Sequence, residues 1–197
     1  MAARSEPATL RLALVPRTGA LTDALLVVAG AGLVALSAQV EFLLPGTPVP
    51  ISGQTFAVLL VGASLGSILG VSSLLLYLAV GLLGAPVYSG GDSGWEIVKG
   101  ATGGYLVGFV VAAYVTGLLA ERRWDRRFSS SVTALLTGTV LIYAFGLPWL
   151  AHVADSGFER TLELGLYPFV VGDLLKLYLA GALLPTAWGL VRRFRGD

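Results

Sequence analysis

The sequence predicts an all-α integral membrane protein, a single domain of six transmembrane helices with both termini in the cytoplasm. Two observations lead to this fold class. First, 55% of the 197 residues are hydrophobic and only 13% are charged, whereas soluble domains carry about a quarter charged residues. Second, at about 20 residues per span plus short loops, the length accommodates six spans and leaves no room for a separate soluble domain.

We expect the spans at residues 24–42, 55–68, 70–84, 102–120, 132–150 and 168–191, after a cytoplasmic tail over residues 1–20. Charged residues and prolines interrupt this tail, so it lacks the apolar core of a secretory signal. The apolar tract from Thr55 to Val87 has 33 residues, too many for one span and slightly few for two. Two spans that turn near residues 66–70 place ten of the thirteen basic residues on the cytoplasmic side, leaving Lys99, Arg160 and Lys176 outside, as the positive-inside rule favours.

The first span contains Ala31 and Ala35, small residues four positions apart that let another helix backbone approach closely in a membrane. Ordinary packing within this chain explains the same residues. After this span, residues 44–54 include three prolines, which lack amide hydrogens and fix their own dihedral angles. We therefore expect a rigid, non-helical connector there.

Residues 84–105 are predicted to form a long outer loop, rich in glycine and carrying Tyr88, Trp95 and Tyr105. Glycines let the backbone approach a ligand closely, and aromatic side chains offer flat apolar walls with a polar rim. The loop suits a lid or half of a pocket, although a flexible loop with interfacial aromatics has the same composition. The segment 102–105 opens the fourth span, where free backbone amides can face a polar solute.

The last span carries one acid and one base, Asp173 and Lys176, inside an apolar run. Each costs about 2.5–3.5 kcal/mol at membrane depth, so the two must find partners. Three residues apart on a helix, they lie on one face. Two hypotheses remain open: a mutually neutralising pair that fixes helix packing, or a pair that binds a solute with both donors and acceptors, such as a cyclic urea.

Several function classes are disfavoured. The chain has no Gly-x-x-x-x-Gly-Lys-Ser/Thr motif, so any energy input must come from a partner. Residues 62–66 match Gly-x-Ser-x-Gly, but the topology separates Ser64 by most of a membrane from His152, the single histidine. One histidine and scattered acids do not form a metal site, and the basic residues do not form a nucleic-acid surface. We expect no enzyme and no cofactor.

Four ordered motifs remain: PVPISGQT at 48–55, YLAVGLLGAPVY at 77–88, TGGYLVGF at 102–109 and GDLLK at 172–176. With them, nearly the whole chain resembles BioY, the biotin-binding membrane subunit (S component) of energy-coupling factor (ECF) transporters. The sequence departs mildly from the family pattern at Ala101, where proline is usual, and at Ser52, where threonine is common. In the glycine loop, it offers Asp92 and Lys99 where many members have asparagine or arginine.

The resemblance implies a six-helix bundle in a prokaryotic plasma membrane, with an outward-facing biotin site. The chain would work with a coupling transmembrane protein and two cytoplasmic ABC-type ATPases. Small residues on the first helix resemble the contact with the coupling protein, with Ala31 and Ala35 preferred over Ala20 and Ala24. The implied ligand-binding residues are Asp173, Lys176, Tyr88, Ser89, Gly90, Gly91, Thr102, Gly103, Tyr105 and Gln54. Uptake of another water-soluble vitamin is the main alternative, followed by a membrane enzyme or an assembly subunit.

Overall fold

A computed structural model describes residues 7–16, 19–42 and 44–195 of the chain. The all-α prediction is confirmed, with one pair of two-residue strands as the exception in the described ranges. The elements are α1 (Leu10–Leu14), α2 (Ala20–Ala38), β1 (Glu41–Phe42), β2 (Ile51–Ser52), α3 (Gln54–Leu65), α4 (Ser67–Leu82), η1 (Ser89–Gly91), α5 (Trp95–Lys99), α6 (Gly103–Glu121), η2 (Trp124–Arg126), α7 (Phe128–Val153), α8 (Phe158–Gly165) and α9 (Val170–Arg195).

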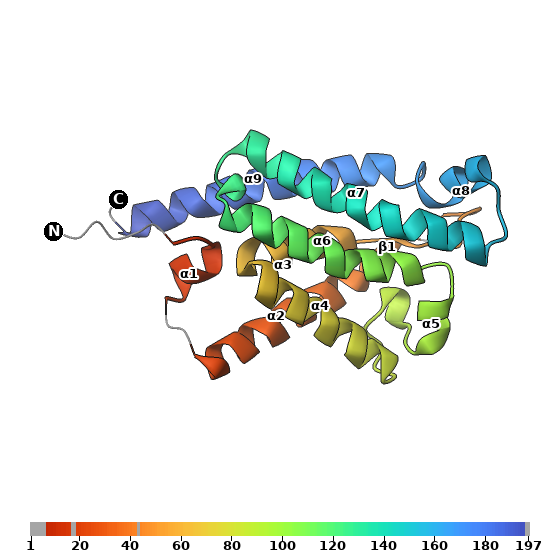
Figure 1. Ribbon diagram of the computed structural model, residues 1–197, viewed down its shortest axis with the longest axis horizontal. Helices are drawn as coiled ribbons and strands as arrows, with labels where there is room; N and C mark the ends of the chain where they lie inside the picture. The colour runs from red at the N-terminus through yellow and green to blue at the C-terminus, as the bar shows by residue number, and fades with distance from the viewer. Residues whose placement is uncertain (1–6, 17–18, 43, 196–197) are drawn as a thin grey trace.

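The long helices form one elongated bundle in which α6 is central, packing against α3, α4 and α7 (Figure 1). Helix α9 packs on α7 and α3, and α2 packs on α4 and α3. The short helix α1 lies at one end of the bundle, whereas α5 and α8 lie at the other. Of the four long apolar helices, α6 is the most enclosed and α2 the most exposed. The bundle therefore has a protein-lined centre around α6 and an apolar periphery.

The tract from Thr55 to Val87 contains two helices, as predicted. They meet at Gly66, whose φ of +90° is a conformation that residues with a Cβ rarely adopt. The Glu121 carboxylate, at the end of α6, accepts hydrogen bonds from the backbone N–H and the hydroxyl of Ser67 (2.7 and 2.8 Å). Because the first N–H groups of a helix lack internal partners, this contact caps α4 and fixes the turn.

Several element bounds differ from the prediction. Helix α2 ends at Ala38, so the expected first span (24–42) stops four residues early. The connector after it is not wholly irregular, because β1 and β2 pair antiparallel across the prolines. The expected tail (1–20) contains α1, which packs against α3 and α9. In the described ranges, four helices (α2, α6, α7 and α9) are long and apolar enough to span a membrane, while α3 and α4 are shorter.

The two alanines predicted to contact the coupling protein are buried or partly buried within this chain. Ala31 is 8% exposed and belongs to the buried core, and Ala35 is partly buried against that core. The other pair considered, Ala20 and Ala24, is exposed. Packing within the chain, the alternative explanation for the first pair, accounts for Ala31.

Candidate ligand-binding site

The two charged residues of the last helix lie at the centre of a polar cluster built by three helices. Asp173 sits in the first turn of α9, where the helix dipole favours an acid. Its Oδ1 lies 3.1 Å from Lys176 Nζ and accepts from the Thr55 hydroxyl of α3 (3.4 Å), while Oδ2 accepts from the Tyr143 hydroxyl of α7. Lys176 Nζ also donates to Thr55 Oγ1 (3.0 Å). The carboxylate, only 6% exposed, is therefore fully satisfied by neighbouring donors.

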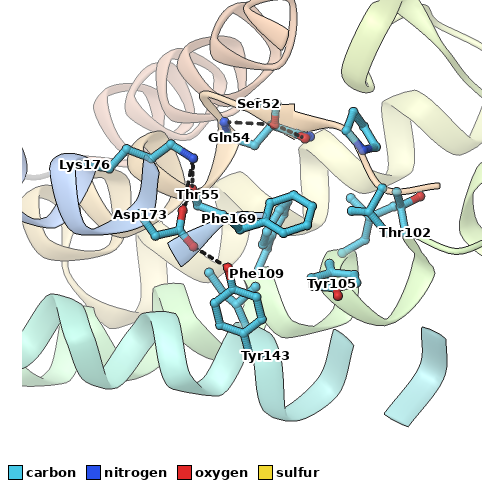
Figure 2. A pocket seen from close by; sticks show the side chains of 14 residues that line it. Ser52, Gln54, Thr55, Thr102, Tyr105, Phe109, Tyr143, Phe169, Asp173 and Lys176 are labelled. Atoms are coloured by element: carbon cyan, nitrogen blue, oxygen red, sulfur yellow. Dashed lines mark hydrogen bonds and ion pairs between the residues drawn. The ribbon is translucent and has the colours of Figure 1, made fainter. Parts of the chain in front are cut away.

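This cluster forms one wall of a cavity, which we call the inner cavity. In Figure 2, Asp173 and Lys176 lie at one side of it and Thr102 at the opposite side. Its remaining walls are mostly apolar and aromatic. The lining residues are Val49, Pro50, Ser52, Gln54, Thr55, Thr102, Tyr105, Leu106, Phe109, Ile142, Tyr143, Phe169, Asp173 and Lys176. A few convergent polar groups within an apolar pocket are typical of small-molecule sites.

Chemically, the polar wall offers both hydrogen-bonding senses within a few ångströms. The Asp173 carboxylate accepts from N–H groups, and the Lys176 ammonium donates to a carbonyl oxygen. In low-dielectric surroundings such bonds are stronger than in water. The inner cavity is narrow, with about 50 Å³ free, room for a few water molecules. A ring-sized ligand therefore requires side chains to move.

A second, outer cavity adjoins the first and shares Pro50, Gln54, Thr102 and Leu106 with it. With about 410 Å³ free, it is much roomier. The glycine loop (residues 84–105), which includes α5, and the strand β1 surround this cavity. The lining residues that it does not share are Glu41, Pro48, Tyr88, Ser89, Gly90, Asp92, Glu96, Ile97, Gly100 and Ala101. The two cavities therefore lie side by side, with these four residues between them.

Of the residues predicted for the site, Gln54 and Thr102 line both cavities. The Gln54 side chain is held by two bonds, accepting from the Ser52 hydroxyl (2.8 Å) and donating to the Tyr77 hydroxyl (2.6 Å). The Thr102 hydroxyl donates to the Ile97 carbonyl (3.1 Å). Both side chains are thus fixed in place at the junction between the cavities.

Tyr105 lines the inner cavity and is held by two contacts of its side chain. Its hydroxyl donates to the Gly165 carbonyl of α8 (2.9 Å), and its ring packs edge-to-face on Tyr143, with centroids 6.2 Å apart. A Cβ at Gly146 would lie 2.4 Å from the Tyr105 ring, so glycine is needed there for α6 and α7 to pack this closely. Tyr105 therefore supports the wall as well as lining it.

The loop residues are divided between the outer cavity and packing roles. Ser89 and Gly90 line the outer cavity, and so does Tyr88, whose hydroxyl donates to the Leu78 carbonyl (2.8 Å). Gly91 and Gly103 are not among the lining residues of either cavity. A Cβ at Gly103 would lie 1.8 Å from the Val98 carbonyl oxygen, so this glycine permits close packing with the loop.

Sequence reasoning missed Tyr143, Thr55, Phe109 and Phe169 as site residues. Thr55 closes one of the recognised motifs, and Tyr143 is the one tyrosine of the predicted span 132–150; both signals are present in the sequence. Phe109 likewise closes the motif at 102–109. Phe169 carries no such signal, because any apolar helix contains residues of this kind.

A protein-family model described as the BioY family matches residues 8–193 of the chain. A protein named biotin transporter BioY from Rhizobium etli is 38% identical over 143 residues, 69% of this chain and 76% of the relative. A probable biotin transporter BioY from Pyrococcus horikoshii is 40% identical over 129 residues, 66% of this chain and 74% of the relative.

One solved structure is also similar, a 2.1 Å crystal structure of the S-component for biotin from an ECF-type ABC transporter. It superposes with a TM-score of 0.75, covering 90% of this chain and 92% of that one at 23% identity. This likeness shows a shared fold.

Proposed function

The chain belongs to the BioY family, and from that premise we propose that it is a biotin uptake protein, which captures the vitamin in the membrane for transport inward. It is a multi-pass membrane protein whose relatives are named as transporters. Its own residues would bind and orient the ligand and perform no covalent chemistry.

The polar cluster around Asp173 is the observation that carries this proposal. Biotin presents a cyclic urea, with two N–H donors on either side of one carbonyl acceptor. The Asp173 carboxylate suits a urea N–H, and the Lys176 ammonium, 3.1 Å away, suits the carbonyl oxygen. The Thr55 and Tyr143 hydroxyls would hold the carboxylate in position as its partners change.

Binding in this pose requires the inner cavity to widen. Lys176 has a long, flexible side chain that is 20% exposed, so it can swing from Asp173 toward a ligand carbonyl. The aromatic rings of Tyr105, Phe109 and Phe169 would then flank the sulfur-containing ring. The loop from Tyr88 to Gly91 would close over the ligand, with Gln54 and Thr102 at the boundary, while Gly103 would serve the site indirectly by packing.

We further propose six spans with both termini in the cytoplasm of a prokaryotic cell. The four long apolar helices would span with α3 and α4 as two short additional spans. The arginines of α1, of the α6–α7 connection and of the end of α9 would then share the cytoplasmic side. The chain contains no cysteine, so single introduced cysteines report without background. Ser156→Cys should react with an impermeant thiol reagent added outside, and Arg127→Cys only after permeabilisation; the reverse pattern would contradict this topology.

Transport would need an energy source outside this chain, which lacks a phosphate-binding loop motif. We propose the partners of an ECF module, namely a coupling transmembrane protein and two ABC-type ATPases. For the contact we favour the exposed Ala20 and Ala24 over the predicted Ala31 and Ala35, because Ala31 is only 8% exposed. Small residues on an exposed face allow close helix approach in lipid.

A binding screen tests the proposed ligand directly. The purified chain in lipid nanodiscs is titrated calorimetrically with biotin and, separately, with other water-soluble vitamins. We expect saturable binding of biotin and none of vitamins without a cyclic urea. The proposal fails if biotin does not bind. Tighter binding of another vitamin would reassign the transported ligand.

A further inference from the structure

An apolar cavity, which we call the lateral cavity, lies where α1, α2, α3 and α9 meet. Helix α3 contacts both α2 and α9, and α1 lies at that end of the bundle (Figure 1). About 400 Å³ is free, and Ser64 carries the single polar side chain among the described lining residues. Ala29, Leu33 and Leu183 of the wall are exposed at the surface of the chain. The lateral cavity is therefore open to whatever surrounds the bundle.

The depth of the lateral cavity points to an apolar occupant. Its wall on α2 runs from Leu26 to Leu33, about 10 Å along the helix axis. In the proposed topology this stretch lies in the cytoplasmic half of the hydrocarbon, which is about 15 Å deep. Water finds almost no hydrogen-bond partners in such a cavity, and an unfilled cavity forfeits the dispersion contacts of its walls. An acyl chain of the cytoplasmic leaflet satisfies both conditions.

A second cavity, the interfacial pocket, adjoins the lateral cavity at the α1 end. The two share Leu65, and the consecutive residues Leu10 and Arg11 of α1 line the lateral cavity and the interfacial pocket respectively. The interfacial pocket has about 430 Å³ free and carries charges of both signs, from Arg11, from Asp23 of α2 and from Glu121 at the end of α6. A ligand that fills both cavities therefore joins an apolar chain to a charged group.

Arg11 is the buried charge of the interfacial pocket. Its side chain is only 7% exposed and forms an ion pair with the Asp23 carboxylate. Its Nε is buried and has no hydrogen-bond partner among the described residues. Because a buried donor without an acceptor is costly, this N–H favours an acceptor from outside the chain. A phosphate oxygen suits it, since guanidinium groups bind phosphate well.

The two acids restrict which phosphate compound fits. One guanidinium and two carboxylates give the described lining residues one more negative than positive charge, which disfavours an anionic ligand. Asp23 Oδ1 pairs with Arg11, and Glu121 Oε1 accepts from the backbone N–H and the hydroxyl of Ser67 (2.7 and 2.8 Å). A carboxylate has about four acceptor sites, so both acids can also accept from an ammonium group that accompanies the phosphate.

We propose that the lateral cavity and the interfacial pocket together bind one phosphatidylethanolamine molecule of the cytoplasmic leaflet. An acyl chain fills the lateral cavity, the phosphate accepts from Arg11, and the primary ammonium donates to Asp23 and Glu121. This site is separate from the biotin site and goes beyond the proposed function, which it uses only to assign the leaflet.

Other occupants match these features less well. Phosphatidylcholine has the same charges but no N–H on its nitrogen, and phosphatidylglycerol has the phosphate without an ammonium. A partner helix is about 10 Å across with its side chains, so it would fit a cavity of about 400 Å³ over about one turn. A narrower acyl chain can lie along the whole wall.

Native mass spectrometry tests the site. The unmodified chain in detergent micelles is mixed with equal amounts of phosphatidylethanolamine, phosphatidylcholine and phosphatidylglycerol that carry identical acyl chains. The lipids retained on each chain are counted after the detergent is removed in the gas phase. We expect one phosphatidylethanolamine per chain, retained roughly three- to tenfold over each of the other two lipids, because only its headgroup satisfies both the Arg11 donor and the two acids.

Three substitutions locate the effect. Ala29→Phe fills the lateral cavity from an exposed position and should lower retention of phosphatidylethanolamine at least threefold. Asp23→Asn should narrow its preference over phosphatidylcholine, and Arg11→Gln should lower retention of all three lipids. The controls are Ala144→Phe and Arg192→Gln, exposed positions that line neither cavity. Thermal midpoints verify that the variants are folded, and if Arg11→Gln is not, the other two decide.

The outcomes separate a built site from the lipid that surrounds any membrane protein. Equal retention of the three lipids, preferential retention of phosphatidylglycerol, or a preference unchanged by both Ala29→Phe and Asp23→Asn overturns the inference. A lipid-free dimer that Ala29→Phe dissociates also overturns it and assigns the lateral cavity to a second copy of the chain. Biotin takes no part in the measurement, so none of these results bears on the proposed function.

Discussion

Two buried carboxylates lie at the two ends of α9, and their surroundings differ. Asp173 borders a cavity and accepts from three side chains, one of them a lysine. Asp125 of η2, 1% exposed, accepts from the Trp188 indole N–H of α9, and its Oδ1 has no hydrogen-bond partner among the described residues. The Arg126 guanidinium stacks over the same indole, 4.0 Å from its centroid.

The contrast separates the proposed binding carboxylate from one that serves packing. Three side chains donate hydrogen bonds to the Asp173 carboxylate. A ligand N–H group can therefore replace one of these donors without leaving the carboxylate unpaired. Asp125 is covered by the buried Trp188 indole of α9, and it joins the connection between α6 and α7 to the last helix. We therefore expect changes at Asp173 to alter ligand affinity and changes at Asp125 to alter stability.

The largest effect is expected from Asp173→Asn. Truncating one partner of a buried charge pair costs about 2–5 kcal/mol, so biotin affinity should fall about 30-fold or more. Calorimetric titration in nanodiscs measures it. The matched control is Asp125→Asn, which should bind biotin normally. Comparable losses of affinity in the two variants would break the comparison.

A second substitution addresses the other end. Trp188→Phe removes the indole N–H that donates to the buried Asp125 carboxylate, which should lower the free energy of unfolding by about 1–3 kcal/mol. The thermal midpoint should drop while biotin binding persists. Trp149→Phe is the control, because that indole bonds to the Gly100 carbonyl at the surface (2.9 Å) and should matter less. An equal drop in both variants would count against a structural role for Asp125.

Tyr143→Phe sharpens the comparison on the binding side. It removes one of the donors to Asp173 while preserving the ring that packs on Tyr105. One such bond contributes about 1–1.5 kcal/mol, so biotin affinity should fall about five- to tenfold. The control is Tyr178→Phe, which removes an exposed hydroxyl from α9, the helix that carries Asp173. Unchanged affinity for Tyr143→Phe would show that the remaining donors suffice.

The smallest expected effect is a pH dependence of stability. Burial raises the pKa of the Asp125 carboxyl above its ordinary value, against the lowering influence of Trp188 and Arg126. The folded chain then holds this proton more strongly than the unfolded chain, in which the pKa is about 3.9. The stabilisation is therefore complete below that value and is lost as pH rises through the folded-state pKa.

Thermal midpoints measured from pH 4 to pH 7 test this sign. Relative to Asp125→Asn, the unmodified chain should become less stable as pH rises. A difference that is constant with pH, or that grows in the opposite direction, would contradict the assigned cause.

The sequence predicted much of the fold because the relevant signals are local. Hydropathy and arginine placement predict the helices, and glycines near residue 66 predict the turn between α3 and α4. The strand pair and α1 were missed, since β1 and β2 have two residues each and α1 has five. Elements this short depend on tertiary contacts rather than on periodicity.

The site was predictable where the membrane makes a residue costly. Asp173 and Lys176 stand out in an apolar run, whereas Asp125 lies among four arginines of a loop interpreted as orienting the chain, and nothing in that pattern signals burial. Tyr105 was assigned to the ligand wall, but its hydroxyl bonds to Gly165, a residue 60 positions away. Such long-range partners are fixed by packing and leave no mark on the local sequence.

The shortness of α4 has a consequence for the lipid around the chain. Its 16 residues rise about 24 Å, less than the hydrocarbon thickness of about 30 Å, and it exposes Ile68 and Leu75 at its surface. On the opposite flank, α7 and α9 have 26 residues each, about 39 Å. In the proposed six-span topology, this unequal hydrophobic mismatch would favour a bilayer that thins beside α4 and long helices that tilt. Acyl-chain length is thus a variable that biases the orientation of the whole bundle in its membrane.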